Sequence, residues 1–222
     1  MEIQRTDEET VEHIKQWWKE NGLAIIIGLA IGFGGIFGVR GWFEHQKNQA
    51  EQASVIYDQL ATSLASRKYE DVIKKGEALI NEYSATPYAS LAALSLAKAK
   101  VEQGNNTGAV IHLNWVIDNA SDSGMQHIAR VRLARLMFAA KDYTGVMKLL
   151  DGQKGSAFQS FYDEIRGDVH MAQGNAAMAG DAYRLAVVSS ERGSQRAQLI
   201  QNKLDDVAVN TLVDATSDSV EK

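Results

Sequence analysis

The chain has 222 residues, a formal net charge of −5, one proline and no cysteine. The lack of cysteine excludes disulfides, zinc–thiolate and iron–sulfur sites and thiol catalysis. Acidic and basic residues are mixed along the chain, so it lacks the clustered basic surface of a nucleic-acid-binding protein. Strong helix formers dominate the C-terminal part and few runs alternate polar and apolar residues, so an all-α fold is predicted.

The N-terminal part contains a candidate membrane span. Nineteen uncharged residues lie between Glu20 and Arg40, and at about 1.5 Å per residue such a helix crosses the ~30 Å hydrocarbon core of a bilayer. Trp18 and Trp42 flank the run, where aromatic belts form. A cleaved signal peptide is the alternative, but an acidic N-terminus and the lack of a small-residue cleavage site favour an uncleaved anchor. We therefore predict a transmembrane helix over residues 21–43.

The charges that flank the span give its orientation. Three basic residues precede it and two follow it within the relevant window, which are Arg5, Lys15, Lys19, Arg40 and Lys47. By the positive-inside rule this bias of three to two favours a cytoplasmic N-terminus. Residues 1–20 are then a cytoplasmic amphipathic segment, and the C-terminal domain lies across the membrane.

Within the cytoplasmic segment, Thr6 and Glu9 have the spacing of a capping box, and Val11, Ile14 and Trp17 form an apolar stripe. Two arrangements fit this pattern. One is a short helix lying on the membrane surface, and the other is a continuous extension of the membrane helix.

Small residues recur every four positions inside the span. Such rows let a second helix approach closely in lipid. Six glycines fall between Gly22 and Gly38, more than the general abundance of glycine in membrane helices explains. The predicted helix-packing residues are Ala24, Gly28, Gly32, Gly34 and Gly38.

Residues 44–209 carry a repeated pattern of helical pairs. Gly167, Gly174, Ala179, Tyr183 and Ala186 fit the tetratricopeptide spacing, with small residues where two helices touch and a turn at Gly174. Similar pairs recur upstream around Leu133-Ala134 and Leu96-Ala97, and a degenerate pair covers residues 49–84 with Tyr69 at its turn. We predict a tetratricopeptide-like solenoid, a capping helix over residues 195–209 and a disordered tail over residues 210–222. A generic helical bundle is the alternative.

No pattern for chemistry stands out. The histidines are scattered, and the chain has no metalloprotease, nucleophile-elbow or phosphate-loop motif. We therefore predict a non-enzymatic protein without a cofactor or metal. The first helices of stacked repeats line a concave surface that suits protein recognition. The predicted groove residues are Leu91, Leu94, Lys98, Val101, Ile128, Arg135, Phe138, Phe161, Glu164, Asp168 and Met171.

The order of several short motifs resembles the YfgM-like family of ancillary SecYEG translocon subunits. These motifs are Val11-Glu12, Ile14-Lys15, Trp17-Trp18, Glu20-Asn21-Gly22, the glycine-rich span, Arg40, Trp42, His45-Gln46, Ala53-Ser54, Tyr57, Tyr88-Ala89, Leu96-Ala97, Arg132-Leu133-Ala134-Arg135, Arg166-Gly167-Asp168, Gly174-Asn175, Ala182-Tyr183 and Lys203-Leu204. The resemblance extends over roughly residues 6–207.

The resemblance implies a single-pass protein of the bacterial inner membrane with a periplasmic repeat domain. It also implies association with the SecYEG channel and with the membrane-anchored periplasmic chaperone PpiD, as an accessory that helps proteins emerging from the channel. An envelope signalling or assembly adaptor, which binds a regulator through the repeat groove, is the alternative function.

Overall fold

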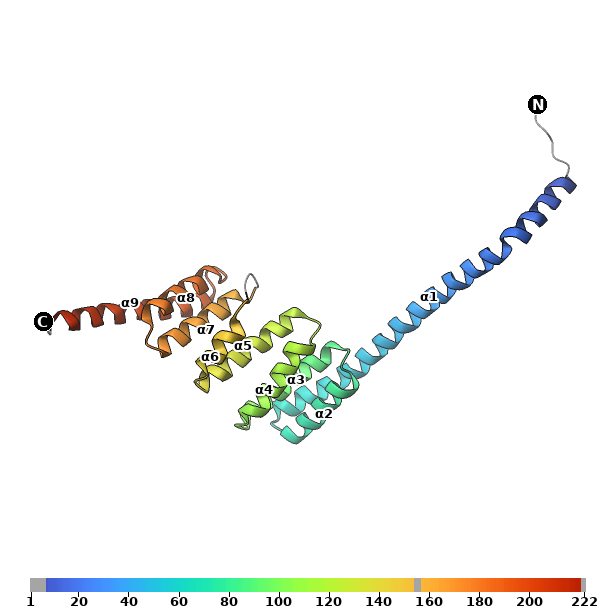
Figure 1. The fold of residues 1–222 in the computed structure, drawn as a ribbon. Helices are drawn as coiled ribbons and strands as arrows, with labels where there is room; N and C mark the ends of the chain where they lie inside the picture. Colours follow the sequence, from blue (N-terminus) through green and yellow to red (C-terminus); the bar gives the residue numbers. More distant parts are fainter. Residues whose placement is uncertain (1–6, 154–156, 221–222) are drawn as a thin grey trace, which may run out of the picture. The chain divides into compact units, whose positions relative to one another are not determined.

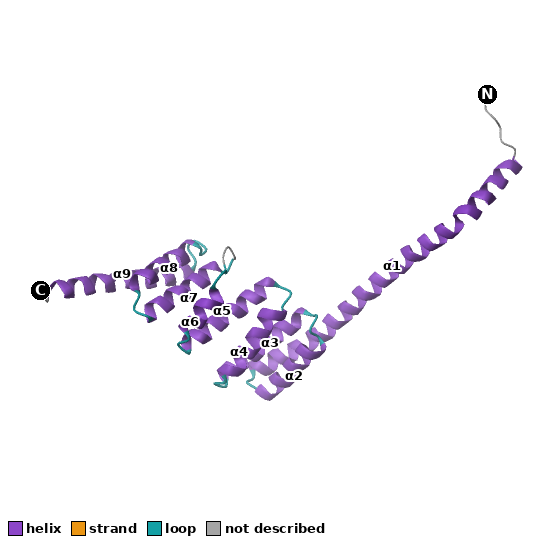
Figure 2. Cartoon of the chain, viewed as in Figure 1, coloured by secondary structure: helices purple, strands orange, loops and turns teal. Residues whose placement is uncertain are grey.

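The computed structural model describes the backbone of residues 7–153 and 157–220, and the side chains of residues 11–153 and 157–208. Over the described backbone the chain forms nine helices and no strand (Figure 2). It divides into two compact units, Met1–Gln52 and Ala53–Lys222. The predicted all-α fold is confirmed.

The first helix, α1, runs without a break over Asp7–Ala65. It is long and apolar enough to cross a membrane, and almost none of its most apolar stretch is buried. The backbone thus takes the second of the two arrangements considered, a continuous extension of the membrane helix. Thr6, half of the predicted capping box, lies outside the described residues.

The following helices form antiparallel pairs, as the ribbon shows (Figure 1). Their bounds are α2 Tyr69–Glu82, α3 Pro87–Glu102, α4 Asn106–Asn119, α5 Ser123–Ala139, α6 Tyr143–Leu150, α7 Gln159–Ala172, α8 Ala176–Val188 and α9 Gln195–Val220. Four hairpins result, and their first helices are the C-terminal end of α1, then α3, α5 and α7. The turns predicted at Tyr69 and at Gly174 lie between paired helices, and a further turn at Gly104 joins α3 to α4, so the repeat pattern is confirmed.

The four hairpin turns share one backbone conformation. A residue in the left-handed region ends the first helix of each pair: Arg67 (φ 56°), Gly104 (φ 73°), Lys141 (φ 61°) and Gly174 (φ 77°). In each turn the next residue donates its N–H to the carbonyl five residues back, as Asn105 does to Lys100 at 2.8 Å. This is the hydrogen-bond pattern of a Schellman motif, which satisfies the last helical carbonyls and reverses the chain.

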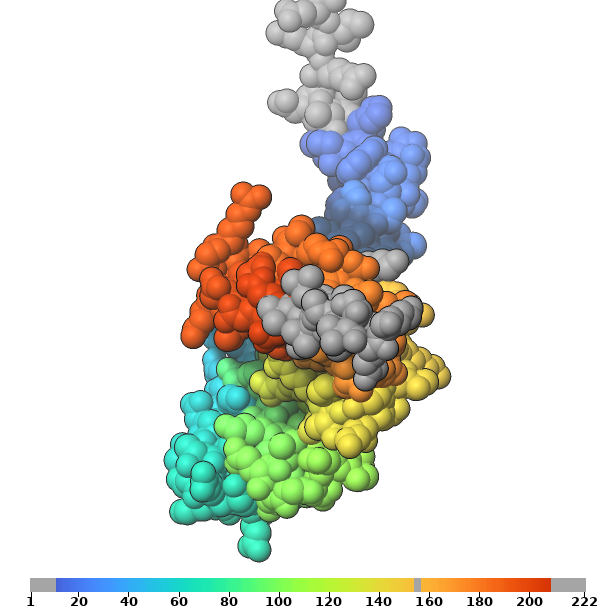
Figure 3. Space-filling view, turned by 90° about the vertical axis from the view of Figure 1, so that its left-hand side faces the viewer, coloured from blue at the N-terminus to red at the C-terminus, as the bar shows by residue number. Residues whose placement is uncertain are grey.

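The core of the repeat domain is a series of apolar clusters between successive helices. One joins the end of α1 to α2 and α3, the next joins α3, α4 and α5, a third joins α5, α6 and α7, and the last joins α8 and α9. Ile80 and Met137 each pack against two clusters, so the core continues from one pair to the next. The space-filling view shows the same succession, from α2 in teal to α8 in orange (Figure 3). In a solenoid each repeat contacts only the repeats next to it, and this series of clusters fits that arrangement.

Small residues allow neighbouring helices to approach, both within a pair, as predicted for Gly167, and between successive pairs. A Cβ atom added to Gly167 on α7 would lie 2.5 Å from Cδ1 of Tyr183 on α8, and one added to Gly76 on α2 would lie 2.6 Å from Cγ of Leu96 on α3. Tyr183 and Leu96 are buried. A side chain at either glycine would therefore displace a close-packed neighbour.

The end of the repeat domain differs from the prediction. Helix α9 begins at Gln195, as expected, but continues to Val220, beyond the predicted end at Val209. The segment after Val209 contains neither glycine nor proline, so the sequence holds no residue that would stop a helix there.

Candidate protein-binding site

The small residues predicted to pack against another membrane helix are exposed along α1. These residues are Ala24, Gly28, Gly32, Gly34 and Gly38. A Cβ atom added to any of the four glycines would meet nothing within 4 Å. Packing among the described residues therefore does not require glycine at these positions, and the face is open to a partner helix.

A pocket of about 420 Å³ lies on the repeat domain between α3, α4 and α5. Its lining residues are Ala97, Lys98, Val101, Glu102, Leu113, Arg132, Arg135 and Leu136. Ala97, Leu113 and Leu136 belong to or pack against the core of these helices. The pocket is thus a shallow opening onto the apolar core, and its volume is in the range of sites that bind ligands or peptide side chains.

Charged side chains of the pocket are weakly paired. Lys98 Nζ lies 3.8 Å from Glu102 Oε1, and Glu102 also accepts a hydrogen bond of 3.0 Å from the hydroxyl of Tyr69. Arg132 and Arg135 are exposed and form no ion pair among the residues whose side chains the structure describes. The pocket therefore combines an apolar floor with guanidinium groups that are available to a ligand.

The structure brings three of the predicted groove residues together here: Lys98, Val101 and Arg135. Leu94 does not belong with them, because it is buried in the core of α3, α4 and α5, where it contacts other helices of the chain. Ile128 packs against the same core and Leu91 is partly buried. Leu94 thus packs within the domain, whereas Lys98, one turn further along α3, lines the pocket.

The predicted aromatic groove residues serve mainly as packing. Phe138 and Phe161 are partly buried against the core of α5, α6 and α7, and Met171 lies against the core of α8 and α9. The guanidinium carbon of Arg196, on α9, lies 3.6 Å from the centre of the Phe161 ring. A cation over the ring face covers Phe161 with the protein's own side chain.

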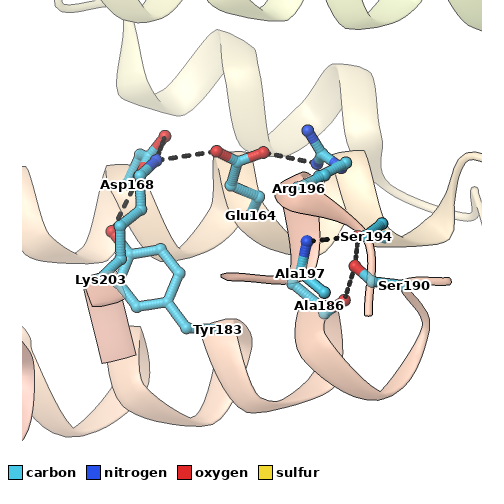
Figure 4. A network of polar contacts seen from close by, with 10 residues as sticks. Glu164, Asp168, Tyr183, Ala186, Ser190, Ser194, Arg196, Ala197 and Lys203 are labelled. Carbon is cyan, nitrogen blue, oxygen red and sulfur yellow. Dashed lines mark hydrogen bonds and ion pairs between the residues drawn. The ribbon is translucent and has the colours of Figure 1, made fainter. Parts of the chain in front are cut away.

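Glu164 and Asp168 belong to a polar network that holds α9 against α7 (Figure 4). Lys203 Nζ lies 2.9 Å from Glu164 Oε1 and 2.7 Å from Asp168 Oδ1. Arg196 donates a hydrogen bond to the other oxygen of Glu164, and the Tyr183 hydroxyl donates one of 2.8 Å to Asp168. The two carboxylates therefore bind side chains of the capping helix, and their assignment to the ligand groove stays a prediction.

The electrostatics of this network agree with its geometry. Burial alone would raise the pKa of Glu164, but hydrogen bonds and charges from Lys203 and Arg196 outweigh it and lower the pKa. Burial would lower the pKa of Lys203, but Asp168 and Glu164 raise it. Burial, the hydrogen bond to Asp168 and nearby negative charge together raise the pKa of Tyr183. All three groups keep their neutral-pH ionisation states, as stable partners require.

A second exposed apolar surface lies on α8, which is the second helix of its pair and not one of the helices predicted to line the groove. Leu185 and Val188 are 58% and 82% exposed, and they line a pocket of about 370 Å³ with Asp181 and Arg184. Met178, also exposed, is on the same face of the helix. The sequence contains a signal for this surface, because apolar residues of α8 occupy the face opposite Ala179 as well as the face with Ala179.

Two features of the described part of the chain bear on catalysis. No group of three or more His, Asp or Glu side chains there is placed to hold a metal. His127 is partly buried: its Nδ1 lies 2.6 Å from the Tyr162 hydroxyl and its ring stacks on Phe158. Burial, followed by the charge of Arg130, lowers the pKa of His127.

Fold and surface together define a class of protein: a helical-repeat scaffold joined to a helix that can anchor it in a membrane. The tetratricopeptide repeat-like domain family matches residues 15–209, which cover the apolar helix and the repeats. No solved structure matches the chain.

Relatives that align along most of this chain share one name. The ancillary SecYEG translocon subunit of Haemophilus influenzae is 30% identical over 203 residues, which cover 90% of this chain and 97% of the relative. That of Escherichia coli is 29% identical over 209 residues, or 94% of this chain and all of the relative. That of Neisseria gonorrhoeae is 24% identical over 203 residues, or 90% and 96%. The chain belongs to this family of ancillary SecYEG translocon subunits.

Proposed function

We propose that this protein is a non-enzymatic accessory subunit of the SecYEG protein translocon. Helix α1 anchors it in the bacterial inner membrane, and the repeat domain works on the periplasmic side. There it binds a membrane-anchored chaperone, PpiD, and assists proteins as they leave the channel.

The observation that carries this proposal is that one chain of this family has two surfaces suited to binding partners. Helix α1 exposes a glycine-rich face with nothing packed on it among the described residues. The repeat domain exposes an apolar pocket with cationic groups. A membrane face suits docking on a channel or chaperone helix, and a pocketed repeat suits binding of a polypeptide segment.

Support for the partner and the compartment comes from different sources. The relatives are named for the SecYEG translocon, and the resemblance of the sequence to the YfgM-like family points to PpiD. The periplasmic position of the repeat domain rests on the excess of basic residues before the span. Binding to the channel, binding to the chaperone and the periplasmic position can therefore be tested separately.

Affinity purification from gently solubilised membranes tests the proposal. The tagged full-length chain should recover channel subunits and the chaperone, in amounts that exceed those recovered by an unrelated single-span protein. Recovery of envelope regulators or assembly factors without any channel subunit would contradict the proposal and favour the adaptor function.

A further inference from the structure

The pocket between α3, α4 and α5 has the composition of a site for a particular kind of polypeptide. Its floor is apolar and includes Val101, which is 41% exposed although it is a large aliphatic residue. Its rim carries three cations, Lys98, Arg132 and Arg135, against one carboxylate, Glu102. A local excess of positive charge in a chain of net charge −5 indicates electrostatic complementarity to an acidic partner.

The two arginines are arranged to act together. Arg132 and Arg135 are three residues apart on α5, so their side chains leave the same face of the helix. Neither forms an ion pair within the part of the chain whose side chains are described. A guanidinium group binds a carboxylate through two parallel hydrogen bonds, which gives it a strong preference for this ligand.

The remaining charges of the pocket do not compensate the arginines. Glu102 is shared between Lys98, at 3.8 Å, and the hydroxyl of Tyr69, at 3.0 Å. Both of these partners come from the α2–α3 side, so Glu102 is occupied away from α5. The floor is too apolar for a free phosphate or a nucleic acid backbone to gain from it.

We propose that this pocket binds an extended or helical protein segment in which apolar side chains alternate with carboxylates. An apolar side chain of the segment lies on Val101, Leu113 and Leu136, and a carboxylate lies between Arg132 and Arg135. A volume of about 420 Å³ admits side chains from such a segment. The inference deepens the proposed function, because it rests on the repeat domain being a protein-binding module and names the chemistry that the module recognises.

Direct binding to full-length protein in uncharged phosphatidylcholine nanodiscs tests this chemistry. Three fluorescent peptides share a leucine-rich pattern and differ only in the intervening residues, which are aspartate, asparagine or lysine. The aspartate peptide should bind about tenfold more tightly than the asparagine peptide, since hydrogen bonds between charged groups contribute more than neutral ones. The lysine peptide should bind most weakly, and added salt should reduce the preference for aspartate.

Variants locate the site. Replacing both arginines (R132Q with R135Q) should weaken binding of the aspartate peptide about tenfold, to the level of the asparagine peptide. R192Q, which removes an exposed arginine from the turn before α9, is the control and should leave binding unchanged. The charge reversal R135E should shift the preference toward the lysine peptide, a gain that misfolding cannot produce.

Equal binding of the aspartate and asparagine peptides, or an equal loss in R192Q, would overturn the inference. Failure of the proposed function would look different. In that case the peptides would bind as described while membrane purification recovered no channel subunit; conversely, a translocon partner could be recovered with no peptide preference at all.

Discussion

Lys203 on α9 donates a hydrogen bond of 2.7 Å to Asp168 on α7, although the two residues are 35 positions apart in the chain. The same carboxylate accepts the Tyr183 hydroxyl, and Lys203 also reaches Glu164. The ammonium group thus joins α9 directly to α7, and Asp168 extends the network to Tyr183 on α8. These contacts add polar partners to the apolar packing of α9 and join it to the last repeat at defined positions.

Lys203→Met should therefore destabilise the repeat domain. The substitution keeps the apolar stem and removes the charge, leaving Glu164 and Asp168, 13% and 26% exposed, without their shared cation. Because Lys203 itself is 37% exposed, solvent screens part of the loss, and we expect about 1–2 kcal/mol in the free energy of unfolding. Urea unfolding followed by circular dichroism measures it.

The matched control is Arg184→Met, which breaks an ion pair with Asp181 in which both side chains are mostly exposed. Surface pairs of this kind contribute about 0–1 kcal/mol. An effect of Arg184→Met equal to that of Lys203→Met would show that the network does not secure α9.

The contribution of this network to the free energy of unfolding should be lost at low pH through Glu164 and at high pH through Lys203. The folded-state pKa of Glu164 is lowered, so its contribution is present above the unfolded value, about 4.3, and is lost as the pH falls through the lower folded value. The folded-state pKa of Lys203 is raised, so its contribution is present below about 10.4 and is lost as the pH rises through the higher folded value.

The measurement is the difference in unfolding free energy between the wild type and Lys203→Met across the pH range. It should stay constant from about pH 5 to pH 9 and shrink below about pH 4. His127, whose pKa is lowered by burial and by Arg130, titrates in both proteins and cancels in the difference. A difference that changes between pH 5 and pH 9 would contradict this account.

The hairpin turns offer a way to stabilise the domain. Arg67 and Lys141 adopt left-handed φ values of 56° and 61°, where Gly104 and Gly174 stand in the other two turns. A side chain in this region costs about 1–2 kcal/mol, while glycine adds entropy to the unfolded chain. Arg67→Gly and Lys141→Gly should each raise the free energy of unfolding by about 0.5–1 kcal/mol. Gly104→Ala is the control and should lower it.

The sequence predicts the helical pairs because their signals are local. Gly104 and Gly174 mark left-handed turns, and Gly167 with Tyr183 marks a helix contact within one repeat. The role of Glu164 could not be predicted in the same way. Its partners Arg196 and Lys203 are 32 and 39 positions away, and no periodicity relates a carboxylate in one repeat to a cation in a capping helix.

The predicted groove residues show the same limit of prediction from the sequence, here for single residues. Lys98, Val101 and Arg135 were assigned to one surface and do line one pocket. Leu94, four residues before Lys98, is buried in the core. A helix face that is half core and half surface changes from one to the other within one turn, so sequence spacing alone does not separate a lining residue from a packing residue.

The orientation of the chain in the membrane can be tested by proteolysis. Because three basic residues precede the span and two follow it, we expect the region after Trp42 to lie outside the cytoplasm. Protease added to spheroplasts should digest the repeat domain and spare the first twenty residues. Protection of the repeat domain in intact spheroplasts, with digestion after lysis, would reverse the assigned orientation.

The glycine face of α1 can be tested without altering the repeat domain. Replacing Gly28 and Gly32 with leucine keeps the span apolar, so membrane insertion should survive. Since nothing within the described residues lies near either position, the new side chains should not disturb the protein itself. They would hold a neighbouring helix away from the backbone of α1 and remove close van der Waals contacts.

If this face docks on a channel or chaperone helix, co-purification of that partner should fall several-fold while the amount and the unfolding midpoint of the protein stay unchanged. The control replaces Ile26 and Phe33 with leucine; both residues are exposed on α1, and neither change fills a small position. Equal recovery of partners by the two variants would show that the glycines are incidental to assembly. Partner binding would then have to come from the repeat domain, and the R132Q and R135Q variants would be expected to lower recovery in place of the glycine substitutions.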